Sequence, residues 1–262
     1  MLTTVAEIRK LLREADAEEF AALERSLVAD TRKGVHDALE AARRRIESER
    51  AEADRLAGLY EFERQLAGGS PDAVIVGLDE VGRGPLAGPL AVGAVVLPRE
   101  PLIEGLNDSK QVKPERRETI AAQIEEIALA FTVQYVSPAD IDRNGMTASL
   151  RRAFCTAIEQ IEGAGVRPDI VLLDGNPLNI DEREVNVVKG DAKCASIAAA
   201  SILAKVRRDA LMCSLAETYP EYGFDENKGY GSPHHLKAIE TYGLTDIHRK
   251  SFCRSFLQET LF

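Results

Sequence analysis

Three things are scarce or missing in this sequence of 262 residues, and each absence argues against a class of protein. The four cysteines are scattered, with no C-x-x-C pair and no histidine at zinc-ligand spacing, so neither a disulfide framework nor a zinc finger is expected. No apolar run is long enough to cross a bilayer, and the acidic N-terminus lacks the apolar core of a signal peptide. We therefore predict a cytoplasmic protein with no membrane partner and with reduced thiols at Cys155, Cys194, Cys213 and Cys253.

An excess of positive charge is the third missing feature. The 33 Lys and Arg are outnumbered by 43 Asp and Glu, and the net charge of −10 argues weakly against a nucleic-acid partner, because binding to phosphates needs a basic surface. Charge acts locally, however, and basic clusters occur at 43–45, 113–117, 205–208 and 248–250. Most such runs are solvated helix faces, which is our prediction for these.

The composition changes near residue 70. Residues 1–66 are rich in Ala, Glu, Arg and Leu, and apolar residues such as Val5 and Ile8 follow helical spacing. We predict two or three helices here, with a break near residues 30–34. The glycines, serine and proline at 68–71 form a linker. The sequence thus predicts a helical N-terminal extension with its linker at 1–70 and a larger domain at 71–262. Packing, partner binding and gripping of a substrate all remain possible roles for the extension.

Strand and helix patterns alternate after the linker. Apolar runs bounded by Gly, Pro or acidic residues predict strands at 74–79, 90–97, 128–136, 169–174 and 185–188. Helical spacing predicts helices at about 114–127, 147–163 and 193–217. The alternation is typical of an α/β domain in which helices pack on a central sheet.

The most informative segment is VIVGLDEVGRGPLAGPLAVGAVVL at 74–97. An apolar strand ends on Asp79 and Glu80, and a glycine-rich loop with an arginine leads into a second strand. A dinucleotide-binding loop does not fit, because the glycine spacing differs from G-x-G-x-x-G and no helix follows. The two acids can be ordinary turn residues, or they can belong to a metal site beside a groove lined by backbone.

Further acids favour the metal site. Asp79 and Glu80 close the first predicted strand, Asp174 closes the fourth, and Asp191 lies at the mouth of a helix. Carboxyl ends of neighbouring strands meet at one edge of an open sheet, and acids gathered there repel one another unless cations share the charge. Oxygen ligands favour Mg²⁺ or Mn²⁺, and two such ions suit phosphoryl transfer. Taken alone, Asp191 can equally be a helix N-cap.

Five segments carry a resemblance to a known family. They are GLDEVGRGPLAGP at 77–89, LNDSK at 106–110, LLDGN at 172–176, VVKGDAKCASIAAASILAKVRRD at 187–209 and YGFDENKGYGSPHHLKAI at 222–239. In order and spacing, over about 74–256, the chain resembles ribonuclease HII. The resemblance implies a ribonuclease H-like mixed five-stranded sheet flanked by helices, with a helical C-terminal part. Residues 1–66 resemble the helical extension of some bacterial members.

The resemblance also implies roles for individual residues. Asp79, Glu80, Asp174 and Asp191 match the metal-binding acidic quartet of the family. Gly82, Arg83 and Gly84 match a motif whose backbone contacts the 2′-hydroxyl of a ribonucleotide, the group that distinguishes RNA from DNA. Asn107, Ser109 and Lys110 match a loop that contacts the phosphate backbone, and Tyr230 matches a tyrosine that packs on the deoxyribose at an RNA–DNA junction. Lys193, Ser196 and Lys205 would give substrate or structural support.

The implied activity is that of an endoribonuclease that uses two Mg²⁺ or Mn²⁺ ions. It would hydrolyse the RNA strand of RNA–DNA hybrids and cut 5′ to ribonucleotides embedded in duplex DNA, leaving 3′-hydroxyl and 5′-phosphate ends. We predict a monomer whose partners are these nucleic acids. His234 and His235 are interpreted as helix-start residues rather than general bases. Gln258, Leu261 and Phe262 loosely match a peptide that binds a sliding clamp, although a simple helical tail also explains them.

Two other functions fit parts of the same pattern. A protein like ribonuclease HIII would prefer longer RNA tracts and carry a differently built N-terminal domain, so Tyr230 and the helical extension favour ribonuclease HII. A non-catalytic protein that binds hybrids could keep the fold, but the intact acidic quartet argues against it. Cleavage at a single ribonucleotide would exclude the activity like that of ribonuclease HIII. Any metal-dependent turnover would exclude the non-catalytic protein.

Overall fold

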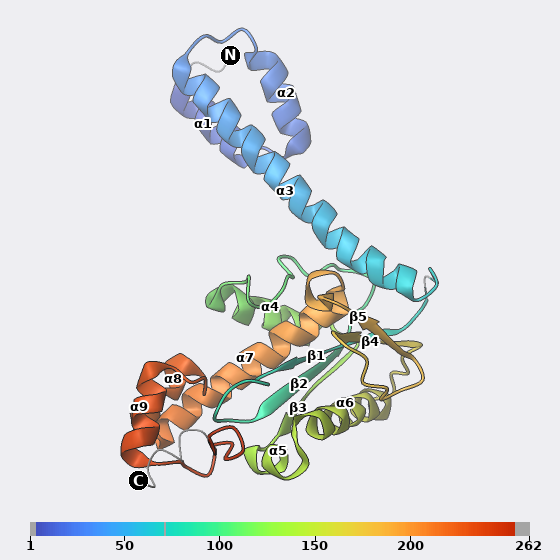
Figure 1. Cartoon of the computed structure of the whole chain (residues 1–262). Coiled ribbons are helices and arrows are strands. Elements are labelled where there is room, and N and C mark those ends of the chain that lie inside the picture. The colour runs from blue at the N-terminus through green and yellow to red at the C-terminus, as the bar shows by residue number, and fades with distance from the viewer. Residues whose placement is uncertain (1–3, 71, 255–262) are drawn as a thin grey trace. The chain divides into compact units, whose positions relative to one another are not determined.

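The computed structural model describes residues 4–70 and 72–254 (Figure 1). Contacts divide the chain into two compact units, Met1–Ala57 and Gly58–Phe262. The division falls inside one long helix, α3 (Lys33–Leu66), whose last residues belong to the second unit. None of the described helices combines the length and apolar character that spanning a membrane requires.

The first unit is helical, as predicted. α1 (Val5–Glu14) and α2 (Ala17–Leu27) precede the first part of α3, and the predicted break near residues 30–34 is confirmed. Thr4 and Asp16 start the two short helices through capping boxes, which satisfy backbone N–H groups of the first turn. The apolar helix faces meet in a small core made of Ile8, Leu12, Ala15, Phe20, Leu27, Val35, Leu39 and Ala42.

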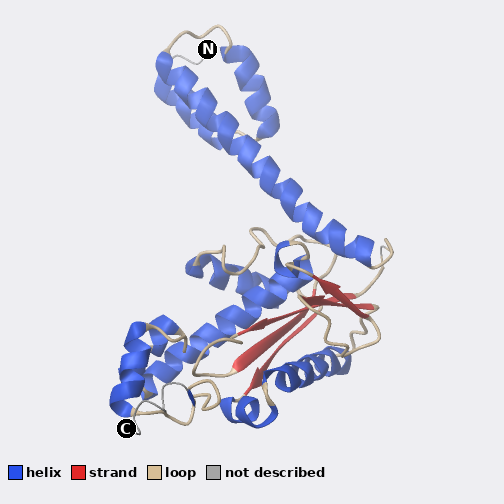
Figure 2. Cartoon of the chain, in the orientation of Figure 1, coloured by secondary structure: helices blue, strands red, loops and turns tan. Residues whose placement is uncertain are grey.

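The second unit is built on a mixed sheet of five strands, which confirms the predicted fold class (Figure 2). The strands are β1 (Ile75–Val81), β2 (Leu90–Val96), β3 (Ala130–Val136), β4 (Ile170–Asp174) and β5 (Glu184–Val187), in the spatial order β3-β2-β1-β4-β5. β1 pairs antiparallel with β2 and parallel with β4, so the central strand joins the two halves of the sheet. The predicted strand ranges agree with these bounds within two residues.

Helices cover both faces of the sheet. The remaining elements are α4 (Pro114–Ile127), α5 (Pro138–Asn144), α6 (Met146–Gly163), η1 (Gly190–Ala192), α7 (Ala195–Thr218), η2 (Pro220–Tyr222), α8 (Phe224–Asn227) and α9 (Pro233–Tyr242). α6 packs on β2 and β3, and α7 packs on β1 and β2 with α4 beside it. The residues of β1 alternate accordingly, with Val76 and Leu78 in the core on the α6 side and Gly77 directly against α7.

Two glycines let α7 approach the sheet closely. A Cβ atom at Gly77 would lie 2.2 Å from the carbonyl carbon of Ser196, and one at Gly93 would lie 2.4 Å from the carbonyl oxygen of Ala200. α7 is buried without interruption from Ala195 to Ala204, and the small residues Ser196 and Ala200 face these two glycines. This contact places the start of α7, and the turn before it, beside the ends of β1 and β4.

The last turns of α3 are part of the second unit. The N–H of Ile103 donates to Tyr60 Oη at 3.2 Å. The N–H and the hydroxyl of Ser196, in the first turn of α7, both donate to Glu63 Oε2, at 2.9 and 2.8 Å. Glu63 is 5% exposed, so a buried carboxylate joins the end of α3 to the start of α7. The compact units meet at residues 57 and 58, whereas the sequence predicts a boundary between extension and larger domain at residue 70, which stays a prediction.

Candidate active site

The four predicted acids come from elements that end beside one another. Asp79 and Glu80 lie near the C-terminal end of β1, and Asp174 is the last residue of β4. β1 and β4 are parallel neighbours, and their register places Asp79 beside Asp174. Asp191 lies in η1, the turn before α7. The sequence therefore brings all four to one end of the sheet through strand endings and a single helix.

Asp79 is buried on the face of β1 that α7 covers. Its side chain is hydrogen-bonded to Ser201 of α7, and its Oδ1 accepts from the N–H of Glu80 at 2.8 Å. Burial raises the pKa of Asp79 well above its ordinary value, and repulsion from Glu80 and Asp174 adds to the rise. An ionised carboxylate at this position is stable only when cations offset its charge.

Glu80 points toward the loop that follows β1. Burial raises its pKa, while attraction to Arg83 opposes the rise and repulsion from Asp174 adds to it. Arg83 Nη1 donates to Glu80 Oε1 at 3.1 Å. The Arg83 side chain is 61% exposed, so this ion pair is weakened by solvent and neutralises Glu80 only in part.

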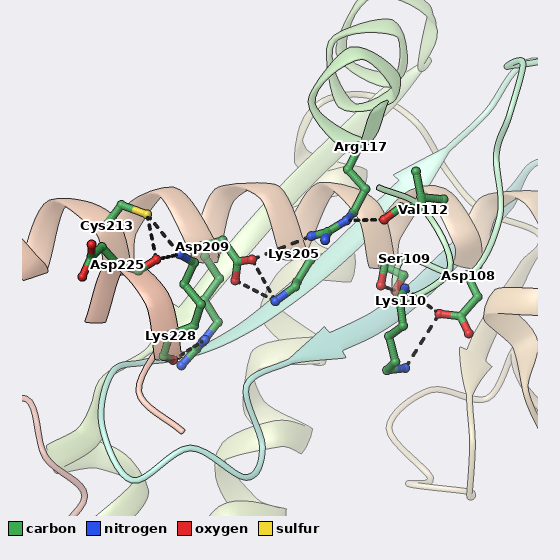
Figure 3. A network of polar contacts seen from close by, with 12 residues as sticks. Asp108, Ser109, Lys110, Val112, Arg117, Lys205, Asp209, Cys213, Asp225 and Lys228 are labelled. Carbon is green, nitrogen blue, oxygen red and sulfur yellow. Dashed lines mark hydrogen bonds and ion pairs between the residues drawn. The ribbon is translucent and has the colours of Figure 1, made fainter. Parts of the chain in front are cut away.

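Asp174 and Asp191 are held by the turn around η1. Asp174 Oδ1 accepts from the N–H of Gly190 at 2.6 Å, and Asp191 Oδ2 lies 3.7 Å from Lys110 Nζ. Figure 3 shows Lys110 beside Asp108, whose Oδ1 lies 3.9 Å from the same ammonium group. Burial raises the pKa of Asp191, and repulsion from Asp108 and Asp174 adds to the rise.

The predicted phosphate-contact loop meets this cluster. Ser109 is buried, and its hydroxyl lies 2.9 Å from the hydroxyl of Ser201. Asn107 Oδ1 accepts from the N–H of Asp108 at 2.9 Å, which shapes the turn. Lys110 carries the exposed side chain of the set, at 80%. Of the three residues, Ser109 and Asn107 order the loop, and Lys110 presents a charge to solvent.

The acids form a donor set rather than a preassembled cage. Among the residues that the structure describes, no group of three or more histidine, cysteine, aspartate or glutamate side chains is arranged to hold a metal ion as it stands. The charges nonetheless act on one another, since the pKa values of Asp79, Glu80 and Asp191 all respond to Asp174.

The glycine-arginine-glycine loop and Tyr230 lie together beside the acids. An ideal Cβ atom on Gly84 would lie 3.8 Å from Tyr230 Cε1, so the tyrosine ring passes next to the loop. The N–H groups of Leu86 and Ala87 both donate to the carbonyl of Gly229, at 2.8 and 3.2 Å. These bonds fix the position of Tyr230, a residue that is 47% exposed.

A row of cationic side chains continues along α7, away from the acids. Figure 3 shows Lys205 and Asp209 on α7 facing Arg117 of α4. Lys205 Nζ lies 2.8 Å from Asp209 Oδ2, and Arg117 Nη1 lies 3.7 Å from the same atom. Lys228, next to α8, donates to the carbonyl of Asp225 and to the thiol of Cys213. Lys205, predicted to give support, is thus part of an ion-pair network beside a cleft.

The prediction that basic clusters form solvated helix faces is wrong for Arg208 and Arg249. Neither residue is exposed at all. Both donate to backbone carbonyls of the loop between β1 and β2. A signal for Arg208 was present, because it falls between Ala204 and Met212 in an apolar row at helical spacing. No local pattern marks Arg249, whose partners lie more than 160 residues earlier.

Ser201 and Glu63 are two further residues that the sequence did not single out. Ser201 joins the phosphate-contact loop to Asp79 through its hydroxyl. Glu63 holds the first turn of α7, which follows Asp191. Serine within a small-residue helix face and one glutamate in an acidic helix carry no distinguishing signal, because both patterns are common in helices.

The histidines and cysteines play no part in the acidic cluster. His234 and His235 lie in the first turn of α9, which confirms their interpretation as helix-start residues. His235 contacts the carbonyl of Tyr230 through Nδ1 at 2.8 Å, and its Nε2 lies 3.1 Å from Nε2 of His248. Burial lowers the pKa of His248 to about 4, and the pKa of His235 is also lowered by burial. All four cysteines are free thiols, as predicted.

Fold and site together define a class of protein. Acids at one end of a mixed sheet, a helix lying directly on that sheet and a glycine loop beside them describe a nuclease with a ribonuclease H-like fold. Family comparison agrees. Residues 76–255 match the model of the family described as Ribonuclease HII, and residues 4–67 match the Ribonuclease HII N-terminal domain. The chain belongs to the ribonuclease HII family.

Relatives with the same name are similar over nearly the whole chain. Ribonuclease HII of Halalkalibacterium halodurans is 42% identical over 252 residues, which cover 95% of this chain and 93% of the relative. Ribonuclease HII of Bacillus cytotoxicus is 41% identical over 249 residues, covering 95% and 94%. Family membership makes the protein a ribonuclease H, a hydrolase of RNA in RNA–DNA hybrids.

Solved structures share the fold of the second unit. Ribonuclease H2 of Pyrococcus horikoshii superimposes with a TM-score of 0.60 at 27% identity, over 71% of this chain and 98% of that chain. The ribonuclease HII of Archaeoglobus fulgidus, solved in a complex with PCNA, gives a TM-score of 0.57 at 27% identity, over 67% and 93%. These matches confirm the mixed sheet flanked by helices.

Proposed function

We propose that the protein is a metal-dependent endoribonuclease that cuts on the 5′ side of ribonucleotides embedded in duplex DNA, in addition to hydrolysing RNA in hybrids. The proposed products are 3′-hydroxyl and 5′-phosphate ends. The observation that carries the proposal is the group of acids beside the loop at 82–84. Burial and mutual repulsion raise the pKa values of Asp79, Glu80 and Asp191, so bound cations would stabilise the ionised form of the site.

The donor set fits Mg²⁺ or Mn²⁺. All four candidate ligands, Asp79, Glu80, Asp174 and Asp191, offer carboxylate oxygens, which hard divalent cations prefer over sulfur or imidazole. The nearby cations Lys110 and Arg83 are largely exposed and offset the charge only in part. When bound, two such ions activate a water molecule and stabilise the leaving oxygen of a phosphodiester.

Other residues of the chain would bind and orient the substrate. We assign Lys110 and Arg83 to the phosphates, the backbone of Gly82–Gly84 to the ribose hydroxyl, and Tyr230 to the deoxyribose on the other side of the junction. Asn107 and Ser109 keep Lys110 in place. In this proposal residues 71–262 form the catalytic domain, and 1–70 form an extension with its linker that adds substrate contacts.

Cleavage of a duplex with one ribonucleotide tests the proposal. An end-labelled DNA duplex that contains a single ribonucleotide is incubated with Mg²⁺, Mn²⁺ or a chelator. We expect one metal-dependent cut 5′ to the ribonucleotide. Asp79→Asn should lower the rate by about 10³-fold, because it removes a charge that acts on the reacting centre. Asp72→Asn, which changes an exposed acid outside the site, serves as the matched control.

Each other outcome contradicts a specific part of the proposal. Cleavage restricted to long RNA tracts would contradict the junction specificity and favour an activity like that of ribonuclease HIII. Full activity of Asp79→Asn would contradict the assignment of the acidic quartet. Binding of hybrids without turnover in any metal would contradict catalysis itself.

Contact with a sliding clamp is part of the proposal for this chain. The ribonuclease HII of Archaeoglobus fulgidus was solved with PCNA. The residues expected to make such a contact here, Gln258, Leu261 and Phe262, lie outside the described residues. Removal of residues 255–262 should abolish binding to the cognate clamp in a surface plasmon resonance assay and leave cleavage of short duplexes unchanged. Equal clamp binding by both forms would contradict this part.

The protein is also proposed to be a monomer, which light scattering of the purified protein checks.

A further inference from the structure

Two buried arginines lie beneath the loop between β1 and β2. Arg208 and Arg249 have no exposed surface, and among the described residues no carboxylate forms an ion pair with either. Burial, with repulsion from Arg208, lowers the pKa of Arg249 to about 10, so the side chain stays charged at neutral pH. A buried charge without a counter-ion is expensive unless hydrogen bonds satisfy it. Their partners therefore show what the two side chains are for.

Among the described residues, every hydrogen-bond partner of the Arg249 side chain is a carbonyl of the loop, and its guanidinium also lies 5.3 Å from the centre of the Phe252 ring. Its Nη1 donates to the carbonyl of Arg83 at 2.9 Å, and its Nη2 donates to the carbonyls of Gly82 and Gly88 at 2.7 and 2.9 Å. Its Nε also donates to Gly88, at 3.0 Å. One planar guanidinium thus fixes the orientation of three peptide groups, which the single ammonium of a lysine cannot reproduce.

These bonds determine where the loop's N–H groups point. In a trans peptide the carbonyl and the following N–H point in opposite directions. Because the carbonyls of Gly82 and Arg83 turn inward to Arg249, the N–H groups of Arg83 and Gly84 turn outward. Within the described part of the chain, neither N–H donates to a protein acceptor. Two oriented donors therefore lie on the surface beside Glu80 and Tyr230.

Arg208 holds the same loop from its other end. It donates to the carbonyls of Pro89, Lys228 and Ala87, at 2.8, 3.0 and 3.4 Å. Gly82 has a φ of +93°, and a Cβ atom there would lie 2.3 Å from Arg208 Nε. Arg208 thus explains why the loop is compact, whereas Arg249 is the residue that orients the peptides at 82 and 83.

We propose that Arg249 is the positioning residue for ribonucleotide discrimination: by binding the carbonyls of Gly82 and Arg83, it presents the N–H groups of Arg83 and Gly84 to the 2′-hydroxyl side of the substrate. The inference rests on the proposed function and extends it. It assigns part of the choice between ribose and deoxyribose to a side chain that does not touch the substrate.

The test compares Arg249→Lys with a second variant in which a substitution far from the loop lowers the stability of the protein. Phe154→Leu, in the core on the α6 side of the sheet, is the matched control because it loosens packing without touching the loop. For each protein, kcat/KM is measured on a duplex with one ribonucleotide, and Ki is measured for the all-DNA twin as a competitive inhibitor. We expect Arg249→Lys to lower kcat/KM by about tenfold or more, with Ki changed less than about twofold.

Hydrogen exchange of the free protein gives a readout that does not depend on activity. The N–H groups of Leu86, Ala87 and Gly88 are bonded in the structure, so their segment should be protected. We expect Arg249→Lys to raise exchange in residues 82–90 by about tenfold. Phe154→Leu should leave this segment unchanged.

The outcomes separate the inference from the function on which it rests. A wild-type protein that does not cleave at a single ribonucleotide contradicts the proposed function, and the inference with it. Wild-type cleavage with an unchanged kcat/KM in Arg249→Lys overturns the inference alone. A fall in kcat/KM matched by an equal rise in Ki would indicate a general binding role and also overturns the inference. Unchanged exchange at 82–90 overturns it too, since the loop would then not need the arginine.

Discussion

Single acidic residues of the site act against the stability of the fold that carries them. Asp79 is buried beside two other carboxylates, and its pKa is raised because both burial and repulsion disfavour the charged form. An acid whose pKa is raised by folding contributes stability below its unfolded pKa and loses that contribution as the pH rises through the raised value. Without metal, this site therefore lowers the stability of the fold at neutral pH relative to acid pH, and such a cost is common where function limits stability.

Asp79→Asn should accordingly be more stable than the wild type in a chelator. The substitution removes the charge and keeps an oxygen that can accept from the N–H of Glu80. We expect the melting temperature at pH 8 to rise by about 2–4 °C, with a smaller rise at pH 5. Mn²⁺ should raise the wild-type melting temperature and affect the variant much less. A lower melting temperature for Asp79→Asn in the chelator would contradict this account.

The contact of Tyr230 with the substrate can be tested with little effect on the stability of the protein, because this residue is about half exposed. Tyr230→Ala should lower cleavage at a ribonucleotide junction by about tenfold or more, since the apolar surface that packs on the deoxyribose is lost. Tyr230→Phe keeps the ring and should stay within about twofold of the wild type. Melting curves should show little change in either variant. Equal rates for the alanine and phenylalanine variants would remove the proposed role of the ring.

At the scale of elements, the close contact of β1 with α7 positions the site. Gly77→Ala would place a Cβ atom 2.2 Å from the backbone of Ser196, which neither element can avoid by moving a side chain. We expect a loss of about 3 kcal/mol or more in the free energy of unfolding, measured in urea. Gly58→Ala, in α3 with open space around it, is the control and should gain about 0.5–1 kcal/mol. Similar values for both variants would show that β1 and α7 can move apart at this contact at little cost in free energy.

Elements were predictable from the sequence where local pattern decides them, and contacts between elements were not. The strands follow from apolar runs, and the two helices that cover the sheet follow from helical spacing. α5 was missed, although Ser137 followed by Pro138 is a helix-start pattern. Glu63 and Arg249 could not have been found, since their partners lie 133 and more than 160 residues away in sequence. Such pairings depend on how the elements pack.

The link between α3 and α7 should make stability depend on pH. Burial raises the pKa of Glu63 from 4.5 to about 7, because the carboxylate is removed from water and hydrogen bonds from Ser196 compensate only in part. Stability is therefore highest below pH 4.5 for this group and falls as the pH rises toward 7.

Glu63→Gln keeps the shape and a hydrogen-bond acceptor but cannot ionise. We expect its free energy of unfolding, relative to the wild type, to rise by up to about 3 kcal/mol between pH 4.5 and 8, as the shift implies. Urea unfolding of both proteins over this range measures the difference, and other titrating groups cancel. A pH-independent difference would show that Glu63 titrates normally in the folded protein.

For the whole molecule, net charge is a poor guide to its partner. The chain carries −10, yet acids concentrated in one site account for part of that charge, while Lys205, Arg117 and Lys228 gather along α7. A nucleic-acid duplex responds to the local surface within about a Debye length, ~8 Å at physiological salt, rather than to the sum. The weak argument from composition against nucleic acid is therefore outweighed by the arrangement of the charges.

The first unit and the end of α3 should contribute differently to the whole enzyme. Removal of residues 1–57 leaves Tyr60 and Glu63 in place, so the second unit should keep its stability. If the extension adds phosphate contacts, KM should rise by about tenfold at 150 mM salt and kcat should stay within about twofold.

Removal of residues 1–66 also takes away the hydrogen bonds of Glu63 to the first turn of α7 and the apolar contacts of Phe62 and Leu66. That shorter protein should melt at a clearly lower temperature. An unchanged KM for the first truncation would assign the extension to packing or to a protein partner, and equal melting temperatures for both would show that the end of α3 is dispensable.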